Sequence, residues 1–133
     1  MGRKKVFVEI PKELVQAFVT AWNKLNHNRY NEGLQAHEIN RGWCYQFALV
    51  MKKVYKNRCT IYTNRCHAWV KMNGLFYDSD HREGTDDRWE IDNSHDEPRH
   101  VTMGECEEYW NKNGSSGEVR WDVIEHAIEL YKR

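Results

Sequence analysis

The sequence predicts an α+β fold in which helices at both ends of the chain flank a small antiparallel sheet. Three observations lead to this prediction. Apolar residues recur with helical spacing near both ends, whereas the central region alternates apolar and polar residues. Within that region, Asn73-Gly74 is the preferred two-residue turn between paired strands. The 133 residues suffice for a single domain over 1–133 and are too few for two ordinary domains.

The first part of the chain predicts two helices. Residues 4–10 form either a short strand or an extended lead-in, and Pro11 suits the first position of a helix. Helical spacing then relates Leu14, Val15, Phe18, Trp22 and Leu25. The polar residues 26–33 predict a loop. We expect a second helix over about residues 43–55, with an apolar side made by Phe47, Ala48, Met51, Val54 and Tyr55.

The centre of the chain predicts strands. Residues 59–64 (CTIYTN) read as one strand, and residues 66–80 (CHAWVKMNGLFYDSD) read as a hairpin around Asn73-Gly74. In the register that this turn sets, the facing pairs are Met72 with Leu75, Val70 with Tyr77, and His67 with Asp80. This hairpin provides the core of the expected sheet.

The last part of the chain predicts one loop and two helices. Residues 79–100 are rich in carboxylates and histidines, so we expect either a solvated connection or a lid over a cleft. A helix over residues 102–114 would open with a capping box, Thr102 with Glu105, and end at Gly114. The final helix, about residues 118–131, is expected to bury Trp121, Ile124, Ile128 and Tyr131.

The composition gives no reason to expect nucleic acid or a membrane as a partner. Lysine plus arginine equals aspartate plus glutamate at 20 each. No apolar run approaches the roughly 18 residues of a membrane span. The start of the chain, MGRKKVFVEIPKE, lacks the features of a secretory signal. We therefore expect a cytoplasmic protein whose four cysteines are reduced. The sequence predicts no oligomeric state.

Cys44 is the first candidate for chemistry, because it stands at the expected start of the second helix. A helix start provides a partial positive charge and unpaired backbone N–H groups. These favour the reactive thiolate and can hold the oxyanion that forms when a thiolate attacks a carbonyl. Gly42, two residues earlier, allows a sharp turn and a close approach of substrate. The position therefore suits a nucleophile.

His67 is the best candidate for the base that such a nucleophile needs. It opens the first strand of the hairpin, with Asp80 directly opposite and Asp78 diagonal to it on the same face. Directly opposed Cβ atoms are about 5 Å apart and diagonal ones about 7–8 Å. Either carboxylate is therefore placed to orient the imidazole, and the three groups of an activated thiol occur in one compact order.

These residues resemble the papain-like superfamily of cysteine enzymes, and most closely its transglutaminase-like branch and the NlpC/P60 peptidases. The resemblance lies in GWCYQFA, followed by HAWVKMNGLFYD, and covers about residues 42–80. It implies a papain-like fold with Cys44 as nucleophile, His67 as general base and acid, and Asp78 as orienting carboxylate. Phe76-Tyr77-Asp78 matches the aromatic-aromatic-aspartate ending of that branch, so Asp78 is preferred and Asp80 is the alternative.

The resulting hypothesis is a thiol enzyme that acts on an amide or peptide bond through a thioester intermediate. Water as acceptor would make it a peptidase, amidase or deamidase, and an amine would make it a transglutaminase-type transferase. The expected partner is a peptide, a protein or a small amide, with no cofactor and no metal. Such a small, neutral protein would suit a bacterium or a phage. Trp43, Tyr45 and Trp69 adjoin the site and either wall a substrate cleft or pack in the core.

Two alternatives remain. An inactive relative could keep the fold for binding only. A zinc protein would draw its ligands from Cys59, Cys66, His67, His81, His95, His100 and Cys106, although no pair has the short spacing of structural zinc sites. In the thiol-enzyme hypothesis, Cys59, Cys66 and Cys106 are core or inert thiols.

Overall fold

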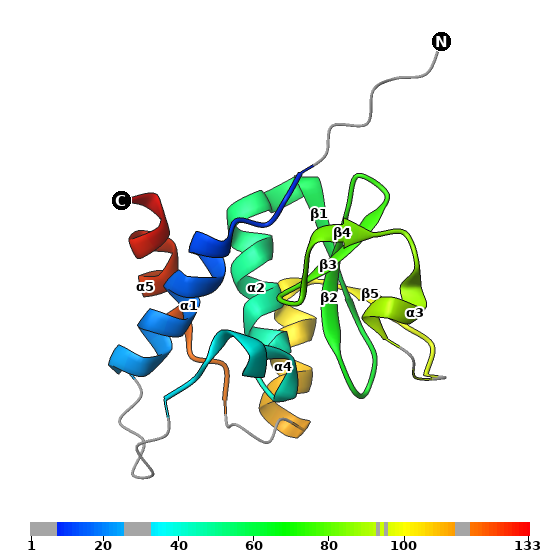
Figure 1. Cartoon of the computed structure of the whole chain (residues 1–133). Helices are drawn as coiled ribbons and strands as arrows, with labels where there is room; N and C mark the ends of the chain where they lie inside the picture. Colours follow the sequence, from blue (N-terminus) through cyan, green and yellow to red (C-terminus); the bar gives the residue numbers. More distant parts are fainter. Residues whose placement is uncertain (1–7, 26–32, 93, 95, 114–117) are drawn as a thin grey trace.

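The computed structural model describes residues 8–25, 33–92, 94, 96–113 and 118–133. In chain order, the helices and strands are α1 (Lys12–Leu25), the 3₁₀ helix η1 (Ala36–Arg41), α2 (Cys44–Tyr55), the 3₁₀ helix η2 (Lys56–Arg58), β1 (Cys59–Thr63), β2 (Ala68–Met72), β3 (Leu75–Asp78), β4 (His81–Thr85), α3 (Arg88–Ile91), β5 (Arg99–Val101), α4 (Met103–Asn113) and α5 (Trp121–Lys132). Helices and a small antiparallel sheet are both present, as the α+β prediction requires (Figure 1).

The sheet has five strands in the order β4-β3-β2-β1-β5, and every neighbouring pair is antiparallel. The predicted hairpin is confirmed, since Met72 pairs with Leu75 and Val70 pairs with Tyr77. Asn73 and Gly74 have φ values of 53° and 80°, as a turn with two left-handed residues requires. The alternation of apolar residues and the turn chemistry together set this register.

Helix α2 lies between the sheet and the helix pair α1 and α5 (Figure 1). Every residue from Cys44 to Met51 is buried, which is expected of a helix with neighbours on all sides. On one side it contacts β1 and β2, and on the other Phe18 of α1 packs on Phe47 with ring centroids 5.7 Å apart. The helix that begins at Cys44 is therefore part of the core and is held rigidly.

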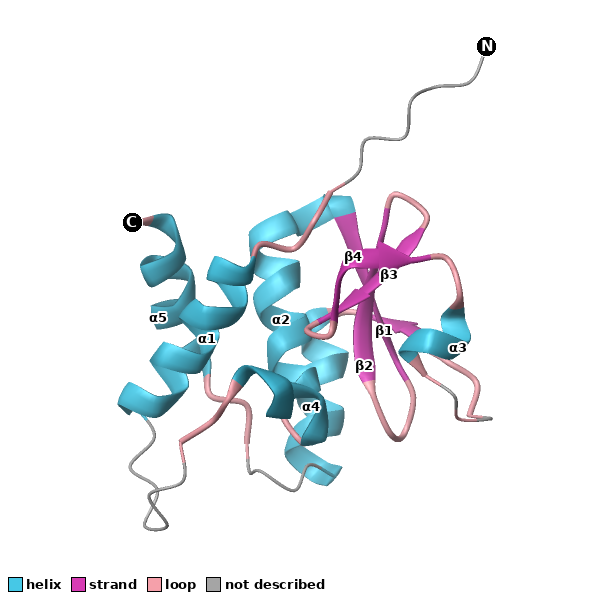
Figure 2. Ribbon diagram, viewed as in Figure 1, coloured by secondary structure: helices cyan, strands magenta, loops and turns pink. Residues whose placement is uncertain are grey.

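The remaining helices cover the same side of the sheet, apart from the short α3 (Figure 2). Helix α4 contacts α2, β1 and β5. Its capping box is confirmed, because Thr102 Oγ1 accepts from the Glu105 N–H (3.1 Å) and Glu105 Oε1 accepts from the Thr102 N–H (2.9 Å). Its predicted end at Gly114 lies outside the described residues.

Several boundaries differ from the predictions. Residues 8–10 form no strand, and the rest of the expected strand or lead-in at 4–7 lies outside the described residues, as does most of the loop at 26–33. The final helix begins at Trp121, three residues later than predicted. Of its four expected core residues, only Ile124 is fully buried, whereas Trp121, Ile128 and Tyr131 are half-buried.

The prediction of a loop or lid over residues 79–100 is wrong. This segment contains β4, α3 and the start of β5, so it completes both edges of the sheet. Gly84 in β4 explains part of the failure, because a Cβ there would lie 2.8 Å from the ring of Tyr77. The Tyr77 ring packs directly on the Gly84 backbone, so β4 lacks a side chain where it meets that ring. A hydrophobic pattern does not reveal such a strand.

Among the described residues, no helix is long and apolar enough to cross a membrane.

Candidate active site

The chain turns sharply before Cys44, which places this residue in the first turn of α2. Helix η1 ends at Gly42, whose φ of 146° favours glycine. The Trp43 N–H donates to the Ile39 carbonyl (2.8 Å), and the Phe47 N–H donates to the Trp43 carbonyl (2.9 Å). The Phe47 bond starts the α-helical pattern, so the N–H groups of residues 44–46 have no acceptor within the helix. The thiol therefore stands beside a set of backbone donors.

Cys44 reaches a cavity of about 290 Å³ although it is only 5% exposed. We call this space the thiol cavity. Its lining comes from the turn before α2, from the turn before β2 and from α4: Asn40, Arg41, Gly42, Cys44, Tyr45, Arg65, Cys66, Tyr109, Trp110 and Asn113. Cys44 is therefore accessible from this cavity, which a cysteine enclosed in the core would not be.

Asn64 holds the turn that leads into the His67 strand. Its Oδ1 accepts from the backbone N–H groups of Cys66 and His67, both at 2.8 Å, and its own N–H donates to the His67 carbonyl (3.1 Å). Its Nδ2 donates to Asp92 Oδ2, and both side chains are buried. These bonds set the backbone of His67 before β2 begins.

The His67 ring contacts both other members of the expected triad. Its Nε2 lies 3.0 Å from Asp78 Oδ2, and the Cys44 thiol is close enough to the ring to raise its pKa. Burial lowers the pKa of His67, but the interactions with Asp78 and Cys44 outweigh this effect and raise the pKa to about 10. The surroundings therefore favour an imidazolium at neutral pH.

Asp78 is buried and is surrounded by donors. Oδ2 faces His67 and also accepts from Asn40 Nδ2 (3.2 Å). Oδ1 accepts from the backbone N–H groups of Asp80 (3.0 Å) and His81 (2.9 Å), and it lies 2.8 Å from His81 Nδ1. Burial raises the pKa of this carboxyl, yet the hydrogen bonds and charges of the two histidines lower it below its usual value. The carboxylate is therefore charged and fixed in orientation.

The structure brings Asp78, rather than Asp80, to His67. Strand β2 starts only at Ala68 and β3 ends at Asp78, so the ladder stops before the pair that would place Asp80 opposite His67. Asp80 instead lies exposed in the turn to β4, where its Oδ2 accepts from Asn40 Nδ2 (3.0 Å). The hairpin geometry did not decide between Asp78 and Asp80 as the partner of His67, and the positions at which the strands end make that choice.

Two of the other three thiols are in the core and the third is not. Burial raises the pKa of Cys59 to about 11 and that of Cys106 to about 12, which makes both poor nucleophiles. Of the two alternatives, core or inert thiol, the core position does not hold for Cys66, which is exposed and borders the thiol cavity beside Cys44. Its Sγ lies 3.9 Å from Asp96 Oδ2.

The three aromatic residues expected near the site take different places. Tyr45 lines the thiol cavity, where it stacks on Trp110 with ring centroids 4.9 Å apart. Trp43 packs edge-on against Trp22 of α1 at 5.7 Å. Trp69 is 1% exposed and stacks on the His67 ring at 5.6 Å. Trp43 and Trp69 do not line the thiol cavity, which agrees with the packing role that the sequence left open for them.

The described part of the chain brings no three histidine, cysteine or acidic side chains into a group that could hold a metal ion. His95, one of the seven potential zinc ligands, lies outside the described residues.

Sequence reasoning missed three residues that contact or position members of the expected triad: Asn40, Asn64 and His81. Asn40 and His81 both bind Asp78, and Asn64 shapes the turn before His67. Only Asn64 carries a local signal, because asparagine favours a turn in which its side chain binds backbone N–H groups two and three residues later. The other two are recognisable only from the folded arrangement.

Comparison with known proteins finds no match to this chain among family models, curated proteins or solved structures.

Proposed function

We propose that this protein is a papain-like cysteine enzyme that acts on an amide or peptide bond, with Cys44 as nucleophile, His67 as base and acid, and Asp78 as the orienting carboxylate. One observation carries the proposal. His67 Nε2 lies 3.0 Å from the buried carboxylate of Asp78, and interactions with that carboxylate and with the Cys44 thiol raise the pKa of the imidazole. This is the order of groups that activates a thiol.

In the proposed reaction, the proton of Cys44 is already on His67 before the substrate binds, and the Cys44 thiolate of this ion pair attacks the carbonyl carbon of the substrate. The resulting oxyanion would be held by backbone N–H groups at the start of α2, including that of Cys44. His67 then gives the proton to the leaving amine, the C–N bond breaks, and an acyl-thioester remains on Cys44. Water or an amine, deprotonated by His67, attacks the thioester and releases the thiolate.

Three features of the site support this chemistry. The raised pKa of His67 favours the imidazolium that must accompany a thiolate. The thiol cavity gives a substrate access to Cys44. The side chain of Glu38, which stands six residues before Cys44 where papain has its oxyanion glutamine, accepts from the Gln35 N–H (2.9 Å) in a capping box. Backbone donors would therefore have to hold the oxyanion.

The test is alkylation by iodoacetamide over a range of pH, with the modification of each cysteine followed by mass spectrometry. We expect Cys44 to be modified selectively at pH 6, ahead of Cys59, Cys66 and Cys106. His67→Ala should abolish this selectivity, whereas the control His100→Ala, which removes an exposed histidine of β5, should not. Equal reactivity of all four cysteines would contradict the proposal and favour a binding module.

A further inference from the structure

The charges around the thiol cavity are of one sign. Two arginines line it, Arg41 and Arg65, and no aspartate or glutamate of the described residues does. The chain as a whole carries 20 basic and 20 acidic residues, so this imbalance is a local property. A cavity lined by guanidinium groups without carboxylates favours an anionic group in whatever enters it.

The two arginines differ in whether they are already paired. Arg65 makes a bidentate ion pair with Asp96, in which Nη2 lies 2.8 Å from Oδ1 and Nε lies 3.3 Å from Oδ2. Arg41 is exposed and its side chain has no hydrogen bond or ion pair with any residue that the structure describes. Arg41 is therefore the guanidinium at this cavity that remains available to a ligand.

The position of Arg41 relative to the thiol is set by the fold. It is the last residue of η1, and only Gly42 and Trp43 separate it from Cys44. Because the chain turns at Gly42, Arg41 and Cys44 line the same cavity. A group bound by Arg41 would thus be close to the bond that the thiol attacks.

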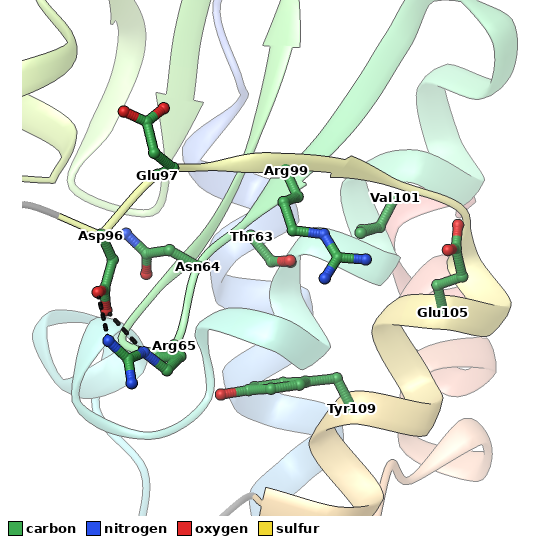
Figure 3. Close-up of a pocket in the computed structure, with 9 residues that line it drawn as sticks. All are labelled: Thr63, Asn64, Arg65, Asp96, Glu97, Arg99, Val101, Glu105 and Tyr109. Atoms are coloured by element: carbon green, nitrogen blue, oxygen red, sulfur yellow. Dashed lines mark hydrogen bonds and ion pairs between the residues drawn. The ribbon is translucent and has the colours of Figure 1, made fainter.

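A neighbouring cavity of about 300 Å³ shares Arg65 and Tyr109 with the thiol cavity (Figure 3). Its charges are mixed, because Arg65 and Arg99 are accompanied by Asp96, Glu97 and Glu105. Figure 3 shows Arg99 directed into this second cavity, while Glu97 points away from it. A longer substrate could extend into this second cavity. Only the thiol cavity, however, is lined by arginines without acidic side chains among the described residues.

We propose that Arg41 is a specificity residue that binds a carboxylate carried by the substrate next to the amide under attack. The inference rests on the proposed function and adds the substrate class, namely a peptide or amide with an acidic group beside the reacting carbonyl. A guanidinium suits this task, since its planar N–H groups can pair with both oxygens of a carboxylate.

The test compares two electrophiles that differ in one negative charge. The rates at which iodoacetate and iodoacetamide alkylate Cys44 are measured by mass spectrometry at neutral pH and low ionic strength, where charge effects are least screened. Arg41→Gln should lower the ratio of the iodoacetate rate to the iodoacetamide rate about twofold to fivefold, the size expected of one exposed ion pair. An effect of Arg41 on the thiolate itself changes both rates alike and cancels in this ratio. Arg41→Lys should retain most of the preference.

Arg58→Gln is the matched control, because Arg58 also ends a 3₁₀ helix and is exposed, but lies beyond the other end of α2. It should alter neither rate. The same ratio of the two rates in wild type and Arg41→Gln, with Cys44 still the most reactive cysteine, would overturn the assignment of Arg41 alone. A wild-type Cys44 no more reactive than Cys59 or Cys106 toward either reagent would overturn the proposed function, and this inference with it.

Discussion

Tyr45, the residue after Cys44, donates a hydrogen bond from its hydroxyl to the carbonyl oxygen of Asn64, three residues before His67. This bond joins the helix of the proposed nucleophile to the turn that sets the proposed base. Asn64 in turn binds the backbone N–H of His67 and the side chain of Asp92. The relative position of the thiol and the imidazole is therefore fixed by buried hydrogen bonds of neighbouring residues, in which the side chains of Cys44 and His67 take no part.

The first prediction concerns this link. Tyr45→Phe removes the hydroxyl and leaves the buried Asn64 carbonyl without its side-chain donor, so the free energy of unfolding should fall by about 1–2 kcal/mol. Urea titration measures the loss. Tyr62→Phe is the control, because no hydrogen bond of its hydroxyl joins it to the described residues, and it should change stability by less than about 0.5 kcal/mol. Equal effects of the two substitutions would contradict the importance of the link.

The second prediction separates the two carboxylates beside the hairpin. Asp78→Asn replaces the negative charge next to His67 by an amide, so the imidazolium loses its partner and the rate of Cys44 alkylation at pH 6 should fall at least about tenfold. Asp80→Asn is the matched substitution two residues later, and it should change that rate less than about twofold. The opposite order of effects would assign the orienting role to Asp80.

The third prediction concerns stability and pH. The pKa of His67 is about 10 in the folded protein and about 6.5 in an unfolded chain, so the folded state binds the additional proton between these values. The stabilisation from this group is complete below about pH 6.5 and is lost as pH rises toward 10, at no more than about 1.4 kcal/mol per pH unit.

The measurement for the third prediction is the difference in the free energy of unfolding between wild type and His67→Gln, from urea titrations at pH 6.5, 7.5 and 8.5. The advantage of wild type should shrink as pH rises. Contributions from the buried thiols of Cys59 and Cys106 occur in both proteins and cancel in the difference. An advantage that is constant or grows with pH would show that His67 is not held as an imidazolium.

The fourth prediction assigns a positioning role to His81, whose Nδ1 lies 2.8 Å from Asp78 Oδ1. His81→Ala removes one donor but leaves the backbone donors of Asp80 and His81, so the rate of Cys44 alkylation should fall only about twofold to tenfold. His81→Asn can place an amide N–H near the Nδ1 position and should restore most of the rate. Loss of stability without a change in alkylation rate would limit His81 to a structural role.

Local patterns were enough to predict the elements that carry the proposed triad. The spacing of apolar residues and the glycine before Cys44 indicated the start of α2, and Asn73-Gly74 indicated the hairpin and its register. These predictions succeed because each depends on residues close together in the chain. The strand β4 was missed for the opposite reason, since it has little apolar pattern of its own and its Gly84 packs against the ring of Tyr77, a residue of the neighbouring strand.

The sequence by itself determined a mixed helix and strand fold, a cysteine at a helix start, and a histidine and two aspartates at one end of a hairpin, because backbone geometry follows from local residue types. Only the tertiary structure decided which aspartate meets the histidine, which side chains hold that aspartate, and which arginine beside the thiol has no partner among the described residues. Those outcomes depend on where strands end and on contacts such as Asn40 to Asp78, between residues far apart in the chain. The packing of the whole chain determines these contacts, and local sequence propensities do not predict them.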